Sequence, residues 1–538
     1  MLIAKSATVI RLLILSLIVM VLLLLFSFTN KTKQALPSIT IPSLPVQKFD
    51  KCDFHVIGHR GNSYDEPEDT LQAVNQAFSN GANFAEIDIR LSKDGIPVLM
   101  HDNLLDRTTD GMGPVANWTV TQLQTLDAGS WKKSELTHIT VPTLAEIIKL
   151  SAHRGSLYLD IKVSNLAPAI ARMLKEHALP ADSIYPAVSS HRMLKRYRKN
   201  LPNTPLVWFR EIPQDWDEKW IVYLKEHGVV GLEFFWPTLL GREDTQELIR
   251  IAHKHDLFVW TYVINEPTVM KAAIQLGIDG IETDRPAALH NVACLNGDGG
   301  PVPQPRIMGS WNFQQHDLQA SIGSRLRHWG YRPEVSQQVK FGSTEDFDLP
   351  AIHGQVAQVL HVPAFQAKHG LQMLPGFHHM GPGSGKYMNQ YTLIMDILRP
   401  QESAGKRQSL LQRHHNNDKN ATVFINEQHQ LNIQASTFGH IEPNQWYRLI
   451  MVASVNSENQ SQMTFYLNGQ FIGQHTVSEI DSEWALSSNL NSRPSLLFSD
   501  NDGETAAIYV NNIQIRDYPM KADDIETLSG PSVAEIPF

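Results

Sequence analysis

The chain has few cysteines and no concentrated positive charge. Its 538 residues contain only Cys52 and Cys294, which excludes a cysteine-rich zinc module and a scaffold held by many disulfides. The net charge is −9 and no long basic run occurs, so a nucleic acid is not expected as a partner. A composition of 42% hydrophobic and 19% charged residues predicts folded domains, and the length predicts two or three of them.

Charge is also absent from residues 12–28, LLILSLIVMVLLLLFSF, a segment just long enough to span a bilayer as a helix. No small-residue cleavage site follows it, so residues 1–30 are predicted to be an uncleaved transmembrane anchor, with a cleaved signal peptide as the alternative. Because few residues precede the segment, the bulk of the chain is expected on the extracytoplasmic side of the membrane. Residues 31–51 contain three prolines and are expected to form a stiff spacer.

Residues 52–295 alternate between short apolar runs that suit strands and amphipathic stretches that suit helices, such as 69–81 and 266–278. The expected strands are 54–58, 84–89, 97–101, 156–163, 183–189, 205–209, 229–234, 257–263 and 279–284. This alternation predicts a parallel α/β domain, a TIM-type (β/α)8 barrel, with an open doubly wound sheet as the structural alternative.

Residues 305–533 have a different pattern, because strand-like runs follow one another without helices between them. In MTFYLNGQFIGQHTV (463–477), Asn468-Gly469 separates two alternating arms, which is a strong signal for a two-residue hairpin turn. The region is therefore predicted to be an all-β sandwich of the jelly-roll kind.

Polar side chains gather where the first predicted strands end, and in a TIM-type barrel the chemistry lies at the carboxyl ends of the strands. His59 and Arg60 follow the first strand. Glu86 and Asp88 are two residues apart, so both carboxylates point to the same side of their strand. Such a pair in a barrel mouth is costly without a cation, and Ca²⁺ or Mg²⁺ prefers oxygen ligands. Taken alone, the pair could instead be a solvated strand face or a salt bridge to Arg90.

The next two strands add to the same set. His101 ends the strand 97–101, and Asp160 and Lys162 lie two apart on one face of the strand 156–163. Three carboxylates suit a divalent metal, two histidines suit proton transfer, and an arginine with a lysine suits an anion. The joint placement predicts one catalytic pocket.

The barrel region resembles the glycerophosphodiester phosphodiesterase family. The resemblance is carried by HRG (59–61), PEDT (67–70), GANFAEIDIRLSKDGIPVLMHD (81–102), RTTDGMG (107–113), LDIK (159–162), VWT (259–261) and GIDGIETDRP (277–286). It implies a barrel with a bound divalent cation, Ca²⁺ or Mg²⁺. The roles that it implies are metal ligands for Glu86, Asp88 and Asp160, general base and acid for His59 and His101 in an unassigned order, and phosphate binding for Arg60 and Lys162.

The chain departs from the family pattern at a few positions. The family usually has Asn where Asp69 stands and Glu where Asp160 stands, and the residues after Thr261 differ as well. Trp260 and Tyr262 are expected to line a pocket for the alcohol group of the substrate, with ordinary barrel packing as the alternative.

The two cysteines flank the barrel. Cys52 precedes the first strand and Cys294 follows the eighth strand-helix unit, so closure of the barrel would bring both thiols to the same end. Outside the cytoplasm this predicts a disulfide, with two unlinked buried cysteines as the alternative.

The sandwich region resembles laminin-G or concanavalin-A-like domains, through QWYRL (445–449), FYLNGQFIG (465–473) and FSDNDGE (498–504), which implies a glycan or protein ligand. The expected function is membrane-tethered, metal-dependent hydrolysis of glycerophosphodiesters to glycerol 3-phosphate and an alcohol. One alternative is a phospholipase D-like hydrolysis of lysophospholipids. Another is an adhesion or glycan-binding protein with a degenerate barrel.

Overall fold

The computed structural model describes residues 53–538 apart from short gaps. The gaps are 134, 153, 177, 210–211, 300–305, 330–338, 367–368, 375–386, 414–420, 457, 488–494, 501–504 and 538. The predicted anchor, the spacer and Cys52 lie outside the described residues and stay predictions. In the described part of the chain, no helix combines the length and the hydropathy that a membrane span requires.

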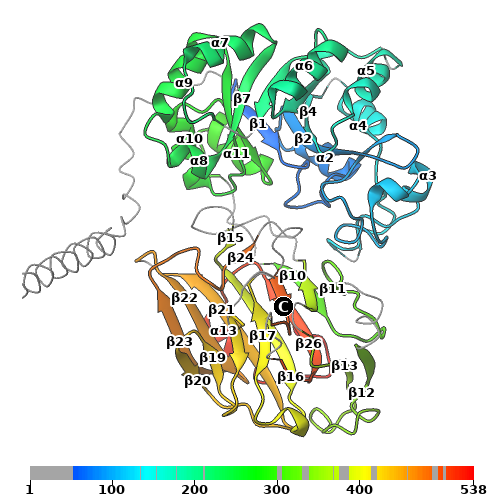
Figure 1. The fold of residues 1–538 in the computed structure, drawn as a ribbon, viewed down its shortest axis with the longest axis vertical. Helices are drawn as coiled ribbons and strands as arrows, with labels where there is room; N and C mark the ends of the chain where they lie inside the picture. The colour runs from blue at the N-terminus through cyan, green and yellow to red at the C-terminus, as the bar shows by residue number, and fades with distance from the viewer. Residues whose placement is uncertain are drawn as a thin grey trace, which may run out of the picture. The chain divides into compact units, whose positions relative to one another are not determined.

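Eight parallel strands close into a barrel (Figure 1). They are β1 (His55–Gly58), β2 (Phe84–Leu91), β4 (Ser156–Ile161), β5 (Ile184–Val188), β6 (Leu206–Phe209), β7 (Val229–Phe235), β8 (Phe258–Tyr262) and β9 (Gly280–Thr283). The first strand pairs with both β9 and β2, with Val56 opposite Ile281 and Ile57 opposite Phe84. This double pairing leaves the barrel strands without an open edge, so the prediction of a (β/α)8 barrel is confirmed and the open sheet is excluded.

The strand expected at 97–101 exists, but its place in the barrel was predicted wrongly. Strand β3 (Pro97–Leu99) runs antiparallel to β2, with Leu91 opposite Pro97, and is not one of the eight barrel strands. The reason is the short connection of residues 92–96, since a parallel crossover needs about a dozen residues or more.

Helices follow the barrel strands and pack on their outer side. They are α2 (Leu71–Ser79), α4 (Leu144–Ser151), α5 (Ala167–Glu176), α6 (His191–Asn200), α7 (Glu218–Glu226), α8 (Trp236–Leu240), α9 (Thr245–Lys254), α10 (Pro267–Leu276) and α11 (Pro286–Cys294). The α2 helix begins where Thr70 accepts a hydrogen bond from the Ala73 N–H, and it buries Val74, Ala77 and Phe78. Its buried residues belong to the core cluster between strands and helices.

The connection between β3 and α4 contributes most of a small hydrophobic cluster, with Leu105, Leu123 and Val141 among its members, and Val98 of β3 also belongs to it. Its regular elements are a 3-10 turn at Val115–Asn117 and α3 (Val120–Leu123). This cluster supports the loop that carries residues 102–107, which become important at the site.

The chain from Ile307 onward forms antiparallel sheets. One sheet has the order β12-β13-β26-β16-β21-β22-β23, with β10 paired to β26, and another has the order β11-β14-β25-β17-β18-β19-β20. The bounds are β10 (Ile307–Trp311), β11 (Arg327–Trp329), β12 (Lys340–Ser343), β13 (Gln358–Val362), β14 (Gly370–Met373), β15 (Tyr387–Met388), β16 (Tyr391–Leu398), β17 (Gln408–Gln412), β18 (Val423–Ile425), β19 (Leu431–Ile433), β20 (Ser436–Phe438), β21 (Trp446–Val455), β22 (Ser461–Leu467), β23 (Gln470–Val477), β24 (Leu486–Ser487), β25 (Ser495–Leu497) and β26 (Ile508–Arg516). Short helical elements of this region are η3 (Gln401–Ser403) and α13 (Ala522–Glu526), and the barrel region contains a further short turn, η2 (Ala181–Ser183).

The two large sheets share one hydrophobic core. Leu393 and Met451 of the first sheet and Leu411 and Val423 of the second belong to the same buried cluster, as expected for a sandwich. The hairpin predicted from Asn468-Gly469 is present, because Leu467 of β22 pairs with Gln470 of β23. The likeness to laminin-G or concanavalin-A-like domains stays a prediction.

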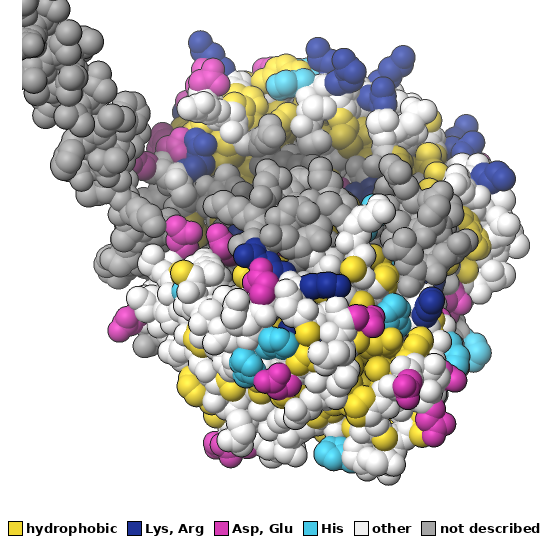
Figure 2. All heavy atoms as spheres, turned by 60° about the horizontal axis from the view of Figure 1, so that its bottom comes forward, with side chains coloured by type: hydrophobic (Ala, Val, Ile, Leu, Met, Phe, Trp, Pro, Cys, Tyr) yellow, Lys and Arg dark blue, Asp and Glu magenta, His cyan; other side chains and the backbone are white. Residues whose placement is uncertain are grey.

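The described surface mixes charges of both signs. On the face that Figure 2 shows, Asp and Glu are scattered among polar and apolar side chains, while Lys and Arg are most frequent along its upper edge. This dispersal agrees with the mild net charge of −9.

Candidate active site

His59 directly follows β1 and is fixed by an acidic neighbour. Its Nδ1 lies 2.6 Å from Asp284 Oδ1 and its Nε2 lies 3.5 Å from Glu282 Oε1. Asp284 is itself held by Ser63, whose Oγ donates to the same oxygen at 2.7 Å, and by Asn265, whose Nδ2 donates to Oδ2 at 2.5 Å. The imidazole therefore has one orientation, with Nδ1 committed to Asp284.

Arg60 adopts a left-handed backbone conformation, with φ of +51°. Its N–H donates to Glu86 Oε2 at 2.8 Å, and its guanidinium Nη1 donates to Glu68 Oε1 at 2.7 Å. The next residue, Gly61, has φ of +84°, and a Cβ there would lie 2.4 Å from the carbonyl carbon of Ala73. The glycine of the HRG motif is thus required by the turn from β1 toward α2.

Glu86, Asp88 and Asp160 come together as predicted for a cation site. Asp88 of β2 is the direct register partner of Asp160 of β4, and one ligand oxygen from each of the three carboxylates lies within 4.8 Å of the others. Glu86 and Asp88 are only 3% and 1% exposed. Three carboxylates at this spacing offer the oxygen donors that Ca²⁺ or Mg²⁺ prefers, so the donor set fits a hard divalent ion.

The electrostatics of this group favour a cation. Burial raises the pKa of Glu86 well above its ordinary value, and the charges of Asp88 and Asp69 add to the effect. Burial would also raise the pKa of Asp88, but Lys162, His101 and Arg60 together lower it instead. The Lys162 Nζ lies 2.8 Å from Asp88 Oδ1 and 2.6 Å from Asp160 Oδ2. A cation bound among the three carboxylates would favour their ionised forms and so offset the cost of burying Glu86.

Asp69 stands where the family usually has Asn, and its contacts explain why an aspartate fits there. Its Oδ1 accepts a hydrogen bond from the Asp88 N–H at 3.0 Å, a role that an Asn oxygen fills equally well. Burial, followed by the charge of Asp88, raises the pKa of Asp69 well above its ordinary value. The contact with the Asp88 backbone can therefore be made by either an aspartate or an asparagine side chain.

His101 reaches the site from the end of β3, although β3 is outside the barrel. Its Nδ1 lies 2.8 Å from Asp102 Oδ1, and its side chain is 31% exposed. The carbonyl oxygen of His101 accepts from Arg90 Nη2 at 2.6 Å. Arg90 is therefore engaged with this backbone, which disfavours the alternative of a salt bridge to Glu86 and Asp88. Burial, and then the charge of Arg60, lowers the pKa of His101.

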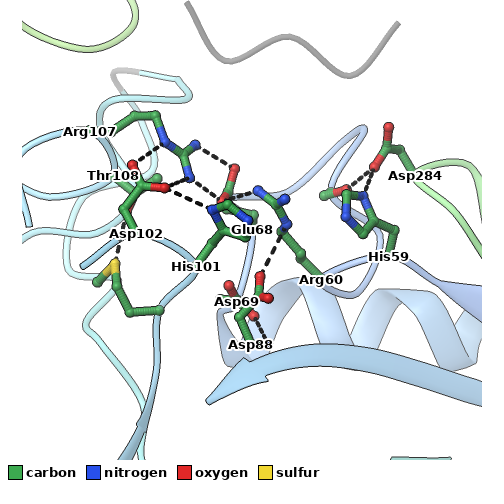
Figure 3. A network of polar contacts seen from close by, with 12 residues as sticks. His59, Arg60, Glu68, Asp69, Asp88, His101, Asp102, Arg107, Thr108 and Asp284 are labelled. Carbon is green, nitrogen blue, oxygen red and sulfur yellow. Dashed lines mark hydrogen bonds and ion pairs between the residues drawn. The ribbon is translucent and has the colours of Figure 1, made fainter. Parts of the chain in front are cut away.

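Figure 3 shows both imidazoles backed by a carboxylate, His59 by Asp284 and His101 by Asp102. In each case Nδ1 faces the carboxylate, which leaves Nε2 as the atom for chemistry. Both histidines were predicted from the sequence, whereas the supporting roles of Asp102 and Asp284 were not. The available signal was the position of Asp102 directly after His101, and the position of Asp284 within the stretch GIDGIETDRP that resembles the family.

Two buried glutamates were missed altogether. Glu233 of β7 is fully buried and hydrogen-bonds the Tyr158 hydroxyl, and Glu282 of β9 is 5% exposed. One ligand atom from each of His59, Glu86 and Glu282 also lies within 4.8 Å of the others. The available signal was an acid between apolar residues in the runs VVGLEF and GIETD, where a solvated side chain is not expected.

Trp260 does not line an open pocket, contrary to the expectation. It is 0% exposed, its Nε1 donates to His55 Nδ1 at 2.7 Å, and its ring stacks on Phe258 at 4.3 Å. The indole fills the barrel interior, which is the packing alternative. Tyr262 is half-buried, with its ring 5.2 Å from that of Phe209, and its expected place in the pocket wall stays a prediction.

Cys294, the last residue of α11, is disulfide-bonded. Cys52 lies outside the described residues, so its pairing with Cys294 stays a prediction.

Comparison with known proteins places this geometry in a family. The pattern of the glycerophosphoryl diester phosphodiesterase family matches residues 59–288, the stretch that holds both histidines and all three carboxylates. Residues 59–288 are a domain of this family. The chain is accordingly an enzyme of the glycerophosphodiester phosphodiesterase class, and the alternative of a protein with a degenerate barrel is set aside.

Individual relatives of the phosphodiesterase domain cover the same region. A glycerophosphodiester phosphodiesterase of Bacillus subtilis is 28% identical over 257 residues, which are 44% of this chain and 85% of that protein. One of Bacillus altitudinis is 29% identical over 237 residues, 43% of this chain and 94% of that protein. A solved Oleispira antarctica phosphodiesterase, in complex with the product sn-glycerol-3-phosphate, is 30% identical and covers 46% of this chain and 96% of its own, with a TM-score of 0.39.

Proposed function

We propose that this enzyme hydrolyses glycerophosphodiesters to glycerol 3-phosphate and an alcohol with the help of a divalent cation, Ca²⁺ or Mg²⁺. The observation that carries the proposal is the meeting of two carboxylate-backed imidazoles with three carboxylates at metal-ligand spacing. The names of the bacterial relatives support the same substrate class.

Glu86, Asp88 and Asp160 would hold the cation, and the cation would neutralise the phosphodiester and the charge that develops on it during the reaction. Arg60 and Lys162 would bind the phosphate oxygens beside it. Both side chains are already held toward Asp88, with Arg60 Nε 3.2 Å from Oδ2 and Lys162 Nζ 2.8 Å from Oδ1. The substrate phosphate would therefore meet two oriented cationic groups.

The two imidazoles would move the protons. One Nε2 would take a proton from the attacking hydroxyl, and the other would give a proton to the leaving alkoxide. The resemblance to the family suggests the glycerol hydroxyl of the substrate as the nucleophile. Its attack would release the alcohol and leave a cyclic glycerol phosphate. A water molecule would then open the ring to give glycerol 3-phosphate, with the two imidazoles exchanging their acid and base roles. Asp284 and Asp102 would keep each ring in the required tautomer through Nδ1.

A second substrate class follows from the apolar segment at residues 12–28. If this segment tethers the enzyme to a membrane, with the barrel on the extracytoplasmic side, lysophospholipids lie within reach of the site. We propose lysophosphatidylcholine as the alternative substrate, and a glycan or protein ligand for the β-sandwich. Parallel assays with glycerophosphocholine and lysophosphatidylcholine separate the two substrate classes.

Replacing either histidine by Asn tests the proposed chemistry. His59→Asn and His101→Asn should each reduce release of glycerol 3-phosphate from glycerophosphocholine by about 10²–10⁴-fold, because each removes one proton-transfer group. His253→Asn, at an exposed site paired with Asp279, serves as the control and should keep its rate. Near-normal rates for either site variant, with an unchanged thermal midpoint, would refute the assignment.

A further inference from the structure

The Arg107 guanidinium lies between two buried carboxylates. Its Nη1 and Nη2 donate to Glu68 Oε2 and Oε1 at 2.8 and 2.6 Å, and its Nε donates to Asp102 Oδ2 at 2.8 Å. The side chains of Arg107 and Glu68 are 5% and 2% exposed. One planar guanidinium thus satisfies two acids at once, a geometry that a lysine ammonium cannot reproduce.

Each of these carboxylates also holds a residue of the proposed site. Glu68 Oε1 accepts from Arg60 Nη1 at 2.7 Å, and Asp102 Oδ1 lies 2.8 Å from His101 Nδ1. Figure 3 shows the resulting network of polar contacts. It runs from Arg60 through Glu68, Arg107 and Asp102 to the imidazole of His101.

The charges explain why this network of side-chain contacts depends on Arg107, which lies at its centre. Burial would raise the pKa of Asp102, but Arg107 and His101 lower it instead, so the carboxylate stays ionised. Without Arg107, Glu68 and Asp102 would be two buried anions with less compensation. Glu68 would then draw Arg60 away from the phosphate, and Asp102 would be free to turn away from His101.

We propose that Arg107 is a positioning residue that aims Arg60 at the substrate phosphate and His101 at its proton-transfer partner. The inference rests on the proposed function of the site. Arg107 itself touches no substrate and acts through Glu68 and Asp102. The backbone of Arg107 is held separately, since Ser324 Oγ donates to its carbonyl oxygen at 2.6 Å, and this bond does not depend on the Arg107 side chain.

Steady-state kinetics of the full chain with glycerophosphocholine test the proposal. Arg107→Ala and Arg107→Lys should lower kcat by about 10²-fold through His101 and raise KM several-fold through Arg60. Guanidinium chloride at low concentration should restore part of the activity of Arg107→Ala, whereas methylammonium chloride at equal ionic strength should not. Values of kcat and KM within twofold of wild type, or equal rescue by both cations, would overturn the proposal.

Double-mutant cycles separate positioning from a general loss of stability. The effect of Arg107→Lys on kcat should shrink when Asp102 is already replaced by Asn, and its effect on KM should shrink when Glu68 is already replaced by Gln. Arg250→Ala, at an exposed arginine paired with Glu247, is the control and should leave both parameters unchanged. Strict additivity in both cycles would overturn the proposal, and the Arg107→Lys cycles decide it even if Arg107→Ala fails to fold.

A failure of the positioning role of Arg107 can be told apart from a failure of the proposed function by the activity of the wild-type chain. If the wild-type chain releases no glycerol 3-phosphate, the function itself is wrong. If the wild type is active and the Arg107 variants are equally active, the positioning role alone is wrong.

Discussion

At the scale of single residues, the barrel interior carries more acid than its basic side chains balance. Glu233 is the extreme case, because it is fully buried and shares the barrel interior with Glu282 and Tyr158. Burial raises the pKa of Glu233 to about 8, although its hydrogen bond with Tyr158 opposes the shift. The folded protein therefore holds a proton on Glu233 at pH values where the unfolded chain has lost it.

Glu233→Gln should make stability less sensitive to alkaline pH. Below about pH 4.5, Glu233 is protonated in both the folded and the unfolded protein, so its ionisation does not lower the free energy of unfolding. Between about pH 4.5 and about pH 8 the unfolded chain ionises first, and the wild type loses stability as the pH rises. With chelator present, the stability gained by Glu233→Gln should be larger, by a few kcal/mol, at about pH 9 than at about pH 5.

Urea unfolding at both pH values measures this difference. Glu247→Gln, at an exposed position, is the control and should show no such growth with pH. An equal effect of Glu233→Gln at both pH values would mean that Glu233 is ionised in the folded barrel at each pH, against the expectation.

At the scale of elements, the turn between β1 and α2 orients His59 and Arg60, and Gly61 allows it. Gly61→Ala should be much more destabilising than Gly95→Ala. Both glycines have positive φ, +84° and +75°, so both alanines incur about 1–2 kcal/mol of backbone strain. Only at Gly61 would the new Cβ meet backbone, at 2.4 Å from Ala73, whereas at Gly95 nothing lies within 4 Å.

Thermal unfolding and activity of the two variants provide the comparison. Gly61→Ala should lower the unfolding midpoint further and also lower activity, since His59 and Arg60 shift with the turn. Equal unfolding midpoints for both variants would contradict the expected clash between a Cβ at residue 61 and the backbone of Ala73.

The elements also show what a sequence can and cannot predict. The barrel strands were predictable because buried parallel strands are short apolar runs between amphipathic helices, and Glu86 and Asp88 were predictable because alternate residues of a strand share a face. The antiparallel direction of β3 could also have been predicted, because the connection of residues 92–96 is too short for a parallel crossover. The contact of His59 with Asp284 depends on closure between β1 and β9, which a local pattern does not contain.

At the scale of the whole molecule, Cys294 is disulfide-bonded near the end of the barrel region. If its partner is Cys52, the bond closes a loop of about 240 residues, for which chain entropy gives on the order of 5 kcal/mol. Dithiothreitol should then lower the free energy of unfolding of the wild type and leave Cys294→Ser unaffected. Non-reducing peptide mapping checks the pairing directly, and an intermolecular Cys294–Cys294 peptide would contradict it.

Every role proposed for the barrel residues depends on a cation-assisted phosphodiesterase site in the barrel. The most direct measurement is the release of glycerol 3-phosphate from glycerophosphocholine by the purified full chain, before and after removal of divalent metal by a chelator. We expect release by the untreated enzyme, loss of at least about 10²-fold on chelation, and recovery when Ca²⁺ or Mg²⁺ is returned. Undiminished release by the chelated enzyme, or no release of glycerol 3-phosphate under any condition, would contradict a cation-assisted phosphodiesterase site in the barrel.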